Sequence, residues 1–253
     1  MGILSKIFGH RPGAASQTAA TDAPADASQV TRPDTAGLTH TDTNKTQAPN
    51  SKGTDMSYQD ILNKRRSVYA LNNQLPVSEE EAVKTIEDAI VASPSAFNVQ
   101  SAQAIILLGD EHKNLWNGIV HDTLEAIVPA DAFEQTAQKL ALFAGAYGTV
   151  LFFENQDAVD QLKEQFPTYA DAFDGFAAHA QGIAQVNVWN ALAEKNIGAN
   201  LQHYNPLIDD AVKARYEVPE SWNLVAQLNF GGIAAPAGEQ QRKPAAERVR
   251  VVR

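Results

Sequence analysis

Residues 91–108 read VASPSAFNVQSAQAIILL, and the order of features in this stretch decides the fold class. A helical pattern that begins at Ser78 ends near Ser93, just before a proline that cannot continue it. A polar loop follows, and the apolar run QAIILL at 103–108 then predicts a buried strand. Helices that alternate with single strands favour an α+β architecture over an all-helical bundle.

The same alternation continues along the chain in both directions. Ser78 and Glu81 have the spacing of a capping box, which satisfies free backbone amides at a helix start. The patterns predict helices at 57–64, 78–93, 110–126, 131–145 and 169–196, a further helix opened by Pro206, and strands at 103–108, 148–154 and 221–232. The helix at 169–196 is apolar on several faces and is expected to end before Gly198, and such a helix is typical of a core or a subunit interface.

The N-terminal fifth of the chain differs in composition from the rest. Residues 11–55 contain no aromatic side chain, and Val30 and Leu38 are their only large aliphatic residues. Such a segment cannot bury enough apolar area to offset the entropy of ordering it. We therefore predict a disordered extension over 1–55 and one folded domain over 56–253. The start MGILSKIFGH is weakly amphipathic, and we interpret it as a flexible leader or docking tag.

Charge and cysteine content exclude several classes of function. Residues 1–55 hold five basic and five acidic side chains, so the formal charge of −10 lies entirely on 56–253. This acidity disfavours nucleic acid as a partner. With no cysteine in the chain, redox chemistry would need a bound cofactor. Because no apolar run is long enough to span a membrane and the start is too weak for a secretory signal, we expect no stable membrane anchoring and a cytoplasmic location.

The histidines do not indicate a metal site. The six of them show no HxH or HExxH spacing, and the chain has no GxSxG, P-loop or GxGxxG motif. We therefore expect neither metal ligands nor a catalytic nucleophile. His179, in the apolar helix, is expected to be an interior residue.

Three polar clusters are candidates for a binding site. They are Arg65-Arg66-Ser67; Asn98, Gln100 and Ser101; and Arg242-Lys243-Pro244. Guanidinium groups suit phosphate, and amides and hydroxyls suit the edge of a planar heterocycle. Each cluster read alone has a simpler interpretation: a solvated helix end, a polar loop and a surface charge pair.

Taken together and in this order, the clusters resemble the nitroreductase family of NAD(P)H oxidoreductases that use flavin mononucleotide (FMN). The resemblance covers about residues 57–252. The matching elements are Arg65-Arg66-Ser67, Pro94-Ser95-Ala96-Phe97-Asn98-Val99-Gln100, the Gly231-Gly232 loop and Arg242-Lys243-Pro244. The stretches GANLQHYNPLID and GIAAPAGE are most similar to the subgroup of small bacterial and fungal members.

The resemblance implies a role for each cluster in binding FMN. Arg65 and Ser67, with Arg66 nearby, would hold the phosphate or the ribityl chain, and Arg242 and Lys243 would close on the phosphate. At the other end of the cofactor, the pyrimidine edge of the flavin would bond to Asn98, with Gln100 and Ser101 beside it. The backbone around Gln202 and His203 would lie near flavin N5.

The resemblance also implies a fold and a reaction. The fold would be a mixed sheet flanked by helices, a three-layer sandwich, in a homodimer with two FMN sites built by both chains. NAD(P)H would deliver hydride to flavin N5, and a small electron-poor acceptor such as a nitroaromatic or quinone would then take it. The cofactor would carry the chemistry, so no side chain is expected to be catalytic.

One position departs from the family pattern. Many members place a basic residue two positions after the motif serine, near flavin N1 and O2, where this chain has Tyr69. A phenol donates a hydrogen bond but carries no positive charge, so the flavin potential should differ. Two alternatives stay open from the sequence: a non-catalytic FMN-binding or storage protein on the same scaffold, and an acidic helical interaction module.

Overall fold

The structure, a computed structural model, describes residues 56–253. The predicted N-terminal extension 1–55, with its amphipathic start, lies outside the described residues, and its disorder stays a prediction. Within residues 56–253, no helix is both long and apolar enough to cross a membrane.

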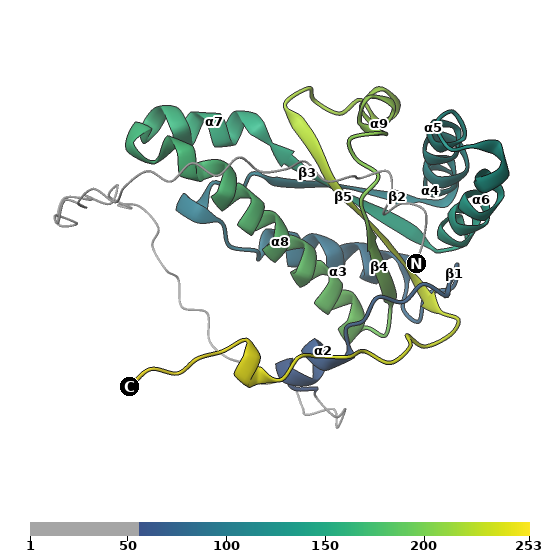
Figure 1. Ribbon diagram of the computed structural model, residues 1–253, viewed down its shortest axis with the longest axis horizontal. Helices are drawn as coiled ribbons and strands as arrows, with labels where there is room; N and C mark the ends of the chain where they lie inside the picture. Colours follow the sequence, from purple (N-terminus) through teal and green to yellow (C-terminus); the bar gives the residue numbers. More distant parts are fainter. Residues whose placement is uncertain (1–55) are drawn as a thin grey trace. The chain divides into compact units, whose positions relative to one another are not determined.

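One sheet forms the centre of the described domain. Its strands are β1 (Leu71–Asn72), β2 (Ala102–Leu108), β3 (Gly148–Asn155), β4 (Gly198–Gln202) and β5 (Trp222–Ile233). The long β5 pairs antiparallel with β1, β3 and β4, and β2 pairs antiparallel with the other edge of β3 (Figure 1). A parallel bridge joins Ser67 to Ala199 of β4. The sheet is therefore mixed, as expected.

The helices occupy the chain between the strands. Their bounds are α2 Tyr58–Lys64, α3 Glu79–Val91, α4 Gly109–Asn114, α5 His121–Glu125, α6 Ala130–Ala144, α7 Gln156–Gln165, α8 Ala170–Glu194 and α9 Asp209–Tyr216, with a π-helical turn, η2, at Leu115–Val120 and short 3-10 turns at Ala96–Asn98 (η1), Pro167–Tyr169 (η3) and Ala245–Glu247 (η4). The predicted cap at Ser78 is confirmed, but Glu81 pairs with Lys195 and does not complete the capping box, and Ser57 caps α2 in addition. Ser57 accepts from the Asp60 amide, and Ser78 accepts from the Glu81 amide.

Helices cover both faces of the sheet, because successive side chains of β3 point to opposite sides. Val150 and Phe152 pack in one core with α3 and α8, and Leu151 and Phe153 pack in a second core with η2, α5, α6 and α9. Figure 1 shows α3 and α8 on one side of the sheet, at the lower left, and α4, α5, α6 and α9 on the other side, at the upper right. The expected three-layer α+β sandwich is confirmed.

The family resemblance implied that Gly231 and Gly232 lie in a loop. In the structure both lie within β5, near its end. A side chain at Gly231 would collide with the backbone carbonyl of Asn72, and one at Gly232 would collide with the carbonyl of Gln74. Glycine is required here because the chain around β1 approaches the backbone of β5 closely.

Several local predictions differ from the structure. Pro206 does not open a helix but lies in a turn before α9, after a cis peptide bond with Asn205. Gly198 does not stop a helix but begins β4. The helix α7 and the strand β4 were not predicted. His179 is exposed on α8, because the apolar residues of that helix leave part of its surface uncovered.

Candidate functional site

Three arginines from two distant parts of the sequence gather where α2 ends. Arg65 is the C-cap residue of α2, and Arg66 donates a hydrogen bond to the carbonyl of Gly238 (2.5 Å). Arg242 donates from Nη1 to the side-chain oxygen of Asn63 on α2 (2.9 Å), so the C-terminal segment lies beside that helix (Figure 1). Burial lowers the pKa of Arg65, and the positive charges of Arg66 and Arg242 lower it further. Two of the three predicted clusters therefore meet.

This arginine cluster has no carboxylate partner within residues 56–253. The guanidinium carbon of Arg65 instead lies 4.5 Å from the centre of the Trp189 indole on α8. An aromatic face attracts a cation without neutralising it, so the charge stays available to a ligand. Lys243, which follows Arg242, is exposed and makes no hydrogen bond to the described residues. Guanidinium groups without a protein counter-ion have the chemistry of a phosphate site.

The segment after the arginines runs along β4. The Val68 amide donates to the carbonyl of Ala199 (2.9 Å), and Val68 itself is buried. Side chains alternate along an extended chain, so Ser67 and Tyr69 both point away from the core, and both are exposed. The Ser67 hydroxyl and the Tyr69 phenol therefore follow the arginine cluster along the exposed side of this segment. A ligand with a phosphate and an aromatic ring could contact all of these groups.

The buried Tyr204 ring lies near an ammonium group that sequence reasoning did not identify. Burial, and next the nearby Tyr69, raises the pKa of Tyr204 to about 12. Lys139 of α6 places its Nζ 5.9 Å from the centre of the Tyr204 ring and 5.4 Å from that of Phe143. Burial lowers the pKa of Lys139, and no carboxylate of residues 56–253 pairs with it. No local sequence pattern marks this lysine.

Gln202 and His203 lie where β4 ends. The Gln202 side chain is buried and donates from Nε2 to the side-chain oxygen of Asn200 (2.8 Å). His203 is exposed. The Gln202 side chain therefore faces inward, and contact of the backbone of this segment with flavin N5 stays a prediction.

The second predicted cluster lies in a strained loop. Phe97, Asn98 and Gln100 have φ angles of 55°, 56° and 52°, in the left-handed region that side chains other than glycine rarely adopt. The loop is braced from within, because the Ser95 hydroxyl accepts from the Gln100 amide (2.9 Å). Strained backbone of this kind is concentrated at binding and catalytic sites. The strain supports a functional role for this loop.

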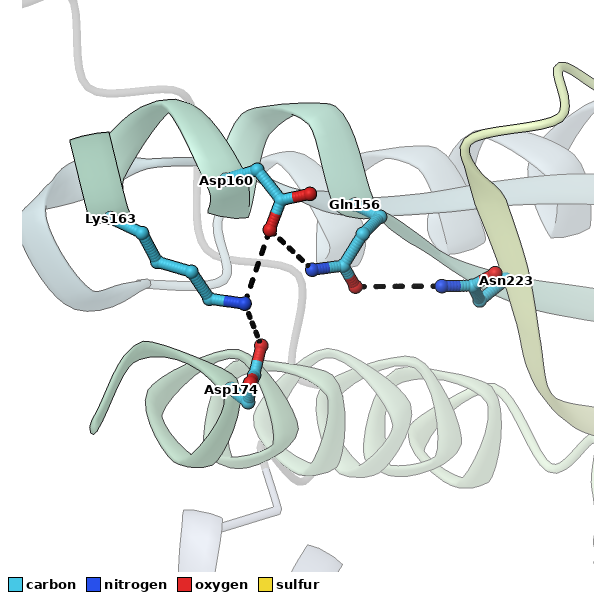
Figure 2. Close-up of polar contacts among 5 residues, drawn as sticks. All are labelled: Gln156, Asp160, Lys163, Asp174 and Asn223. Atoms are coloured by element: carbon cyan, nitrogen blue, oxygen red, sulfur yellow. Dashed lines mark hydrogen bonds and ion pairs between the residues drawn. The ribbon is translucent and has the colours of Figure 1, made fainter. Parts of the chain in front are cut away.

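Aromatic contacts hold the strained loop in place. The Phe97 ring lies 4.9 Å from that of Phe166 and 5.4 Å from that of Phe173 on α8, between centroids. Figure 2 shows how α7, which ends just before Phe166, is tied to α8, which carries Phe173. Lys163 of α7 pairs with Asp174 of α8 (2.7 Å) and with Asp160 (3.1 Å). The loop is thus fixed to the α7–α8 pair, although the Phe97 ring is 53 % exposed.

The three polar residues of this loop have different accessibility. Asn98 and Gln100 are exposed, and the Asn98 side-chain amide makes no hydrogen bond within residues 56–253. Ser101, in contrast, is fully buried, and its hydroxyl has no partner among the described residues. Asn98 and Gln100 are therefore available to a ligand as they stand, whereas contact with Ser101 stays a prediction.

The loop and the arginine cluster lie near opposite ends of α8. The loop packs on Phe173 through Phe97, and the cluster packs on Trp189 through Arg65. The separation of sixteen positions from Phe173 to Trp189 corresponds to about 24 Å along a helix axis. One chain therefore does not bring the three predicted clusters to a single point.

Comparison with known proteins adds to this geometry. The pattern of the nitroreductase family matches residues 62–232, most of the described domain. The chain belongs to the nitroreductase family. Members are NAD(P)H-dependent flavin oxidoreductases, typically with FMN bound, and this chain is an enzyme of that family.

Both bacterial and fungal nitroreductases are similar to this chain. The structure of nitroreductase CinD from Lactococcus lactis in complex with chloramphenicol is 46 % identical, covers 78 % of this chain and 100 % of its own, and superposes with a TM-score of 0.72. The same enzyme with 4-nitrophenol gives the same values. The putative nitroreductase HBN1 of Saccharomyces cerevisiae is 37 % identical over 73 % of this chain and 92 % of its own length.

Proposed function

We propose that this nitroreductase binds FMN and passes hydride from NAD(P)H to nitroaromatic or quinone acceptors. The observation that carries the proposal is the arginine cluster of Arg65, Arg66 and Arg242. It gathers three positive charges that no carboxylate of residues 56–253 pairs with, in a chain whose formal charge is −10. A cluster of positive side chains in an otherwise acidic protein favours binding of an anion, and the phosphate of FMN is such an anion.

The residues present fit the other parts of FMN. Ser67 and Tyr69 would face the ribityl chain and the ring from one side, and the backbone after Gln202 would border the ring. Asn98 would bond the pyrimidine edge, which offers both donors and acceptors to an amide. When bound, FMN supplies hydride transfer through N5, so the protein needs no nucleophile. The task of these side chains is to bind, orient and exclude water.

We further propose that the active form is a homodimer. The arginine cluster and the Asn98 loop are about 24 Å apart along α8 in one chain. A second copy would bring its own loop to the first copy's arginine cluster, so that each site is completed by both. Ile183 and Val186 support this arrangement, because they leave apolar surface exposed on α8 between the two half-sites.

The choice of acceptor rests on the relatives. CinD has been crystallised with chloramphenicol and with 4-nitrophenol, both of which are nitroaromatics. With 46 % identity over its whole length, it is close enough for the same substrate class to be proposed here. Quinones are likewise electron-poor compounds that accept hydride, and we propose them as a second class of acceptor. The cytoplasmic location stays a prediction.

Flavin binding is the direct test of this proposal. The full chain is purified, any bound flavin is extracted and identified, and the stripped protein is titrated with FMN while the flavin fluorescence is recorded. We expect one FMN for each chain. Protein that contains no flavin and does not bind added FMN would refute the proposal.

A further inference from the structure

Asn200, in the middle of β4, connects two segments of the candidate site through one buried side chain. Its Nδ2 donates to the backbone carbonyl of Val68 (2.9 Å), and its Oδ1 accepts from the side chain of Gln202 (2.8 Å) and from that of Asn229 (3.3 Å). Asn200 is completely buried, so water does not compete for these bonds. One amide therefore fixes the segment with Ser67 and Tyr69 relative to the end of β4.

The position of Val68 depends on this side chain. Its amide donates to the carbonyl of Ala199, a normal contact between neighbouring strands (2.9 Å). Its carbonyl accepts from the Asn200 side chain, where a regular strand pair would offer another backbone amide. Loss of the Asn200 amide would leave a buried carbonyl without this donor, and the segment would shift to recover a partner.

The orientation of Asn200 is determined by its neighbours. A backbone carbonyl can only accept, so the side-chain nitrogen of Asn200 must face Val68 and its oxygen must face Asn229. The Asn229 nitrogen then faces Asn200, and its oxygen accepts from the hydroxyl of Thr149 (2.7 Å). Asn229 and Thr149 are also completely buried. The amides cannot flip without placing two acceptors against each other.

The chain of bonds continues into the opposite helical layer. The Thr149 hydroxyl has one proton, which it donates to Asn229, so it must accept from its other two neighbours. These are Nε1 of Trp116 and Nδ1 of His112, each at 2.9 Å. His112 therefore carries its proton on Nδ1 when neutral. A buried polar chain thus runs from η2 and α4 through β3 and β5 to β4, and it ends on the backbone of the candidate site.

We propose that Asn200 is a positioning residue of the FMN site. It holds the segment 67–69 and the end of β4 in the relative arrangement that the cofactor requires. The inference rests on the proposed function, because it concerns how the same site binds FMN. It assigns to Asn200 a role that no feature of the sequence indicates, since this buried asparagine does not face the ligand.

The test compares two buried substitutions in the same polar chain. Asn200→Ala removes the bond to Val68, whereas Thr149→Val removes the hydroxyl that links Asn229 to His112 and leaves the Asn200–Val68 bond intact. Both variants lose buried hydrogen bonds and are expected to be less stable. Affinity for FMN, measured by fluorescence titration of the stripped full-length protein, is expected to fall about tenfold in Asn200→Ala and less than about twofold in Thr149→Val.

The outcomes separate the inference from the proposed function. Equal FMN affinity in the two variants, or losses that follow only their melting temperatures, would overturn the positioning role while the wild type still binds FMN. A wild type that does not bind FMN would refute the proposed function, and with it this role. Should Asn200→Ala fail to fold, Asn200→Ser replaces it, because the shorter hydroxyl side chain fills the site partly without spanning to Val68. Wild-type FMN affinity in Asn200→Ser would equally overturn the inference.

Discussion

The Arg65 guanidinium lies 4.5 Å from the centre of the Trp189 indole ring, which fixes the arginine cluster to α8. Burial and the neighbouring positive charges of Arg66 and Arg242 disfavour the charged form of Arg65, as its lowered pKa indicates. The indole face offsets part of this cost without supplying a negative charge. A bound phosphate would supply that negative charge, whereas a ligand without a phosphate would not.

Riboflavin, which lacks the phosphate, distinguishes the role of Arg65. Arg65→Ala is expected to weaken FMN binding by about tenfold or more and to leave riboflavin binding nearly unchanged, because a charge-assisted bond to phosphate is worth roughly 1.5–3 kcal/mol. Lys243→Ala should weaken FMN binding in the same direction. The measurement is a pair of fluorescence titrations for each variant. Equal loss for both ligands would place Arg65 away from the phosphate.

Mixed dimers test whether two chains complete each site. Arg65→Ala and Asn98→Ala each damage one half-site, so each variant alone should bind FMN weakly. In a mixed dimer of the two variants, one of the two binding sites would combine the intact Arg65 of one chain with the intact Asn98 of the other. The second site would lack both side chains. Co-expression with two affinity tags isolates that dimer, and we expect one tightly bound FMN in it. Weak binding throughout would show that one chain builds the whole site.

In the strained loop, glycine at position 97 is expected to give a more stable protein than alanine, which is the reverse of the usual order. Glycine normally destabilises a folded chain relative to alanine, but at Phe97 the φ angle of 55° favours glycine. Both substitutions remove the ring that contacts Phe166 and Phe173, so their difference reports the backbone alone. Phe97→Gly is expected to be more stable than Phe97→Ala by about 1 kcal/mol in urea unfolding. The opposite order would mean that the loop has no strain at this residue.

His112 gives the domain a specific dependence on pH. Burial lowers its pKa from 6.5 to about 4, an effect that the Lys113 charge adds to and that the backbone of Ala144, Phe143 and Ala146 opposes, although Nε2 itself makes no hydrogen bond within residues 56–253. Between those two pH values the unfolded chain binds the proton and the folded chain does not. Stability is therefore complete above pH 6.5 and falls as the pH decreases towards 4, by about 3 kcal/mol for this group.

The control for this prediction is His112→Asn. Its side-chain nitrogen can donate to Thr149 as Nδ1 does, but it does not titrate. The free energy of unfolding, measured by urea at several pH values, should decrease more steeply in the wild type than in the variant between pH 6.5 and 4. Parallel curves for the two proteins would contradict the assignment.

The sequence predicts those parts of the fold whose signals are local. The Ser78 cap locates α3, and the apolar runs locate β2, β3 and β5, since burial on both faces requires such runs. It does not predict β4, because GANLQ carries Asn200 and Gln202 at buried positions where an apolar pattern is expected. Those amides are buried only because distant residues satisfy them, and that information is not local.

The candidate site divides in the same way. Arg65, Arg66 and Arg242 are recognisable from residue type as candidates for binding phosphate, and the structure brings them together. Trp189, Lys139 and Asn200 are not recognisable, because their importance comes from the residues that they contact in space. The left-handed backbone at Phe97 is similarly not recognisable, since no glycine in the sequence marks the bend and the rings that contact Phe97 are distant in sequence.

Anaerobic reduction and reoxidation of the FMN-loaded protein tests the central claim most directly. The visible flavin absorbance is followed while NADH or NADPH is added in steps, and 4-nitrophenol or a quinone is then introduced. The account predicts that the flavin bleaches with one equivalent of nicotinamide nucleotide and regains its colour with the acceptor. Flavin that stays bound and oxidised with both nucleotides would contradict it and would indicate a protein that stores FMN.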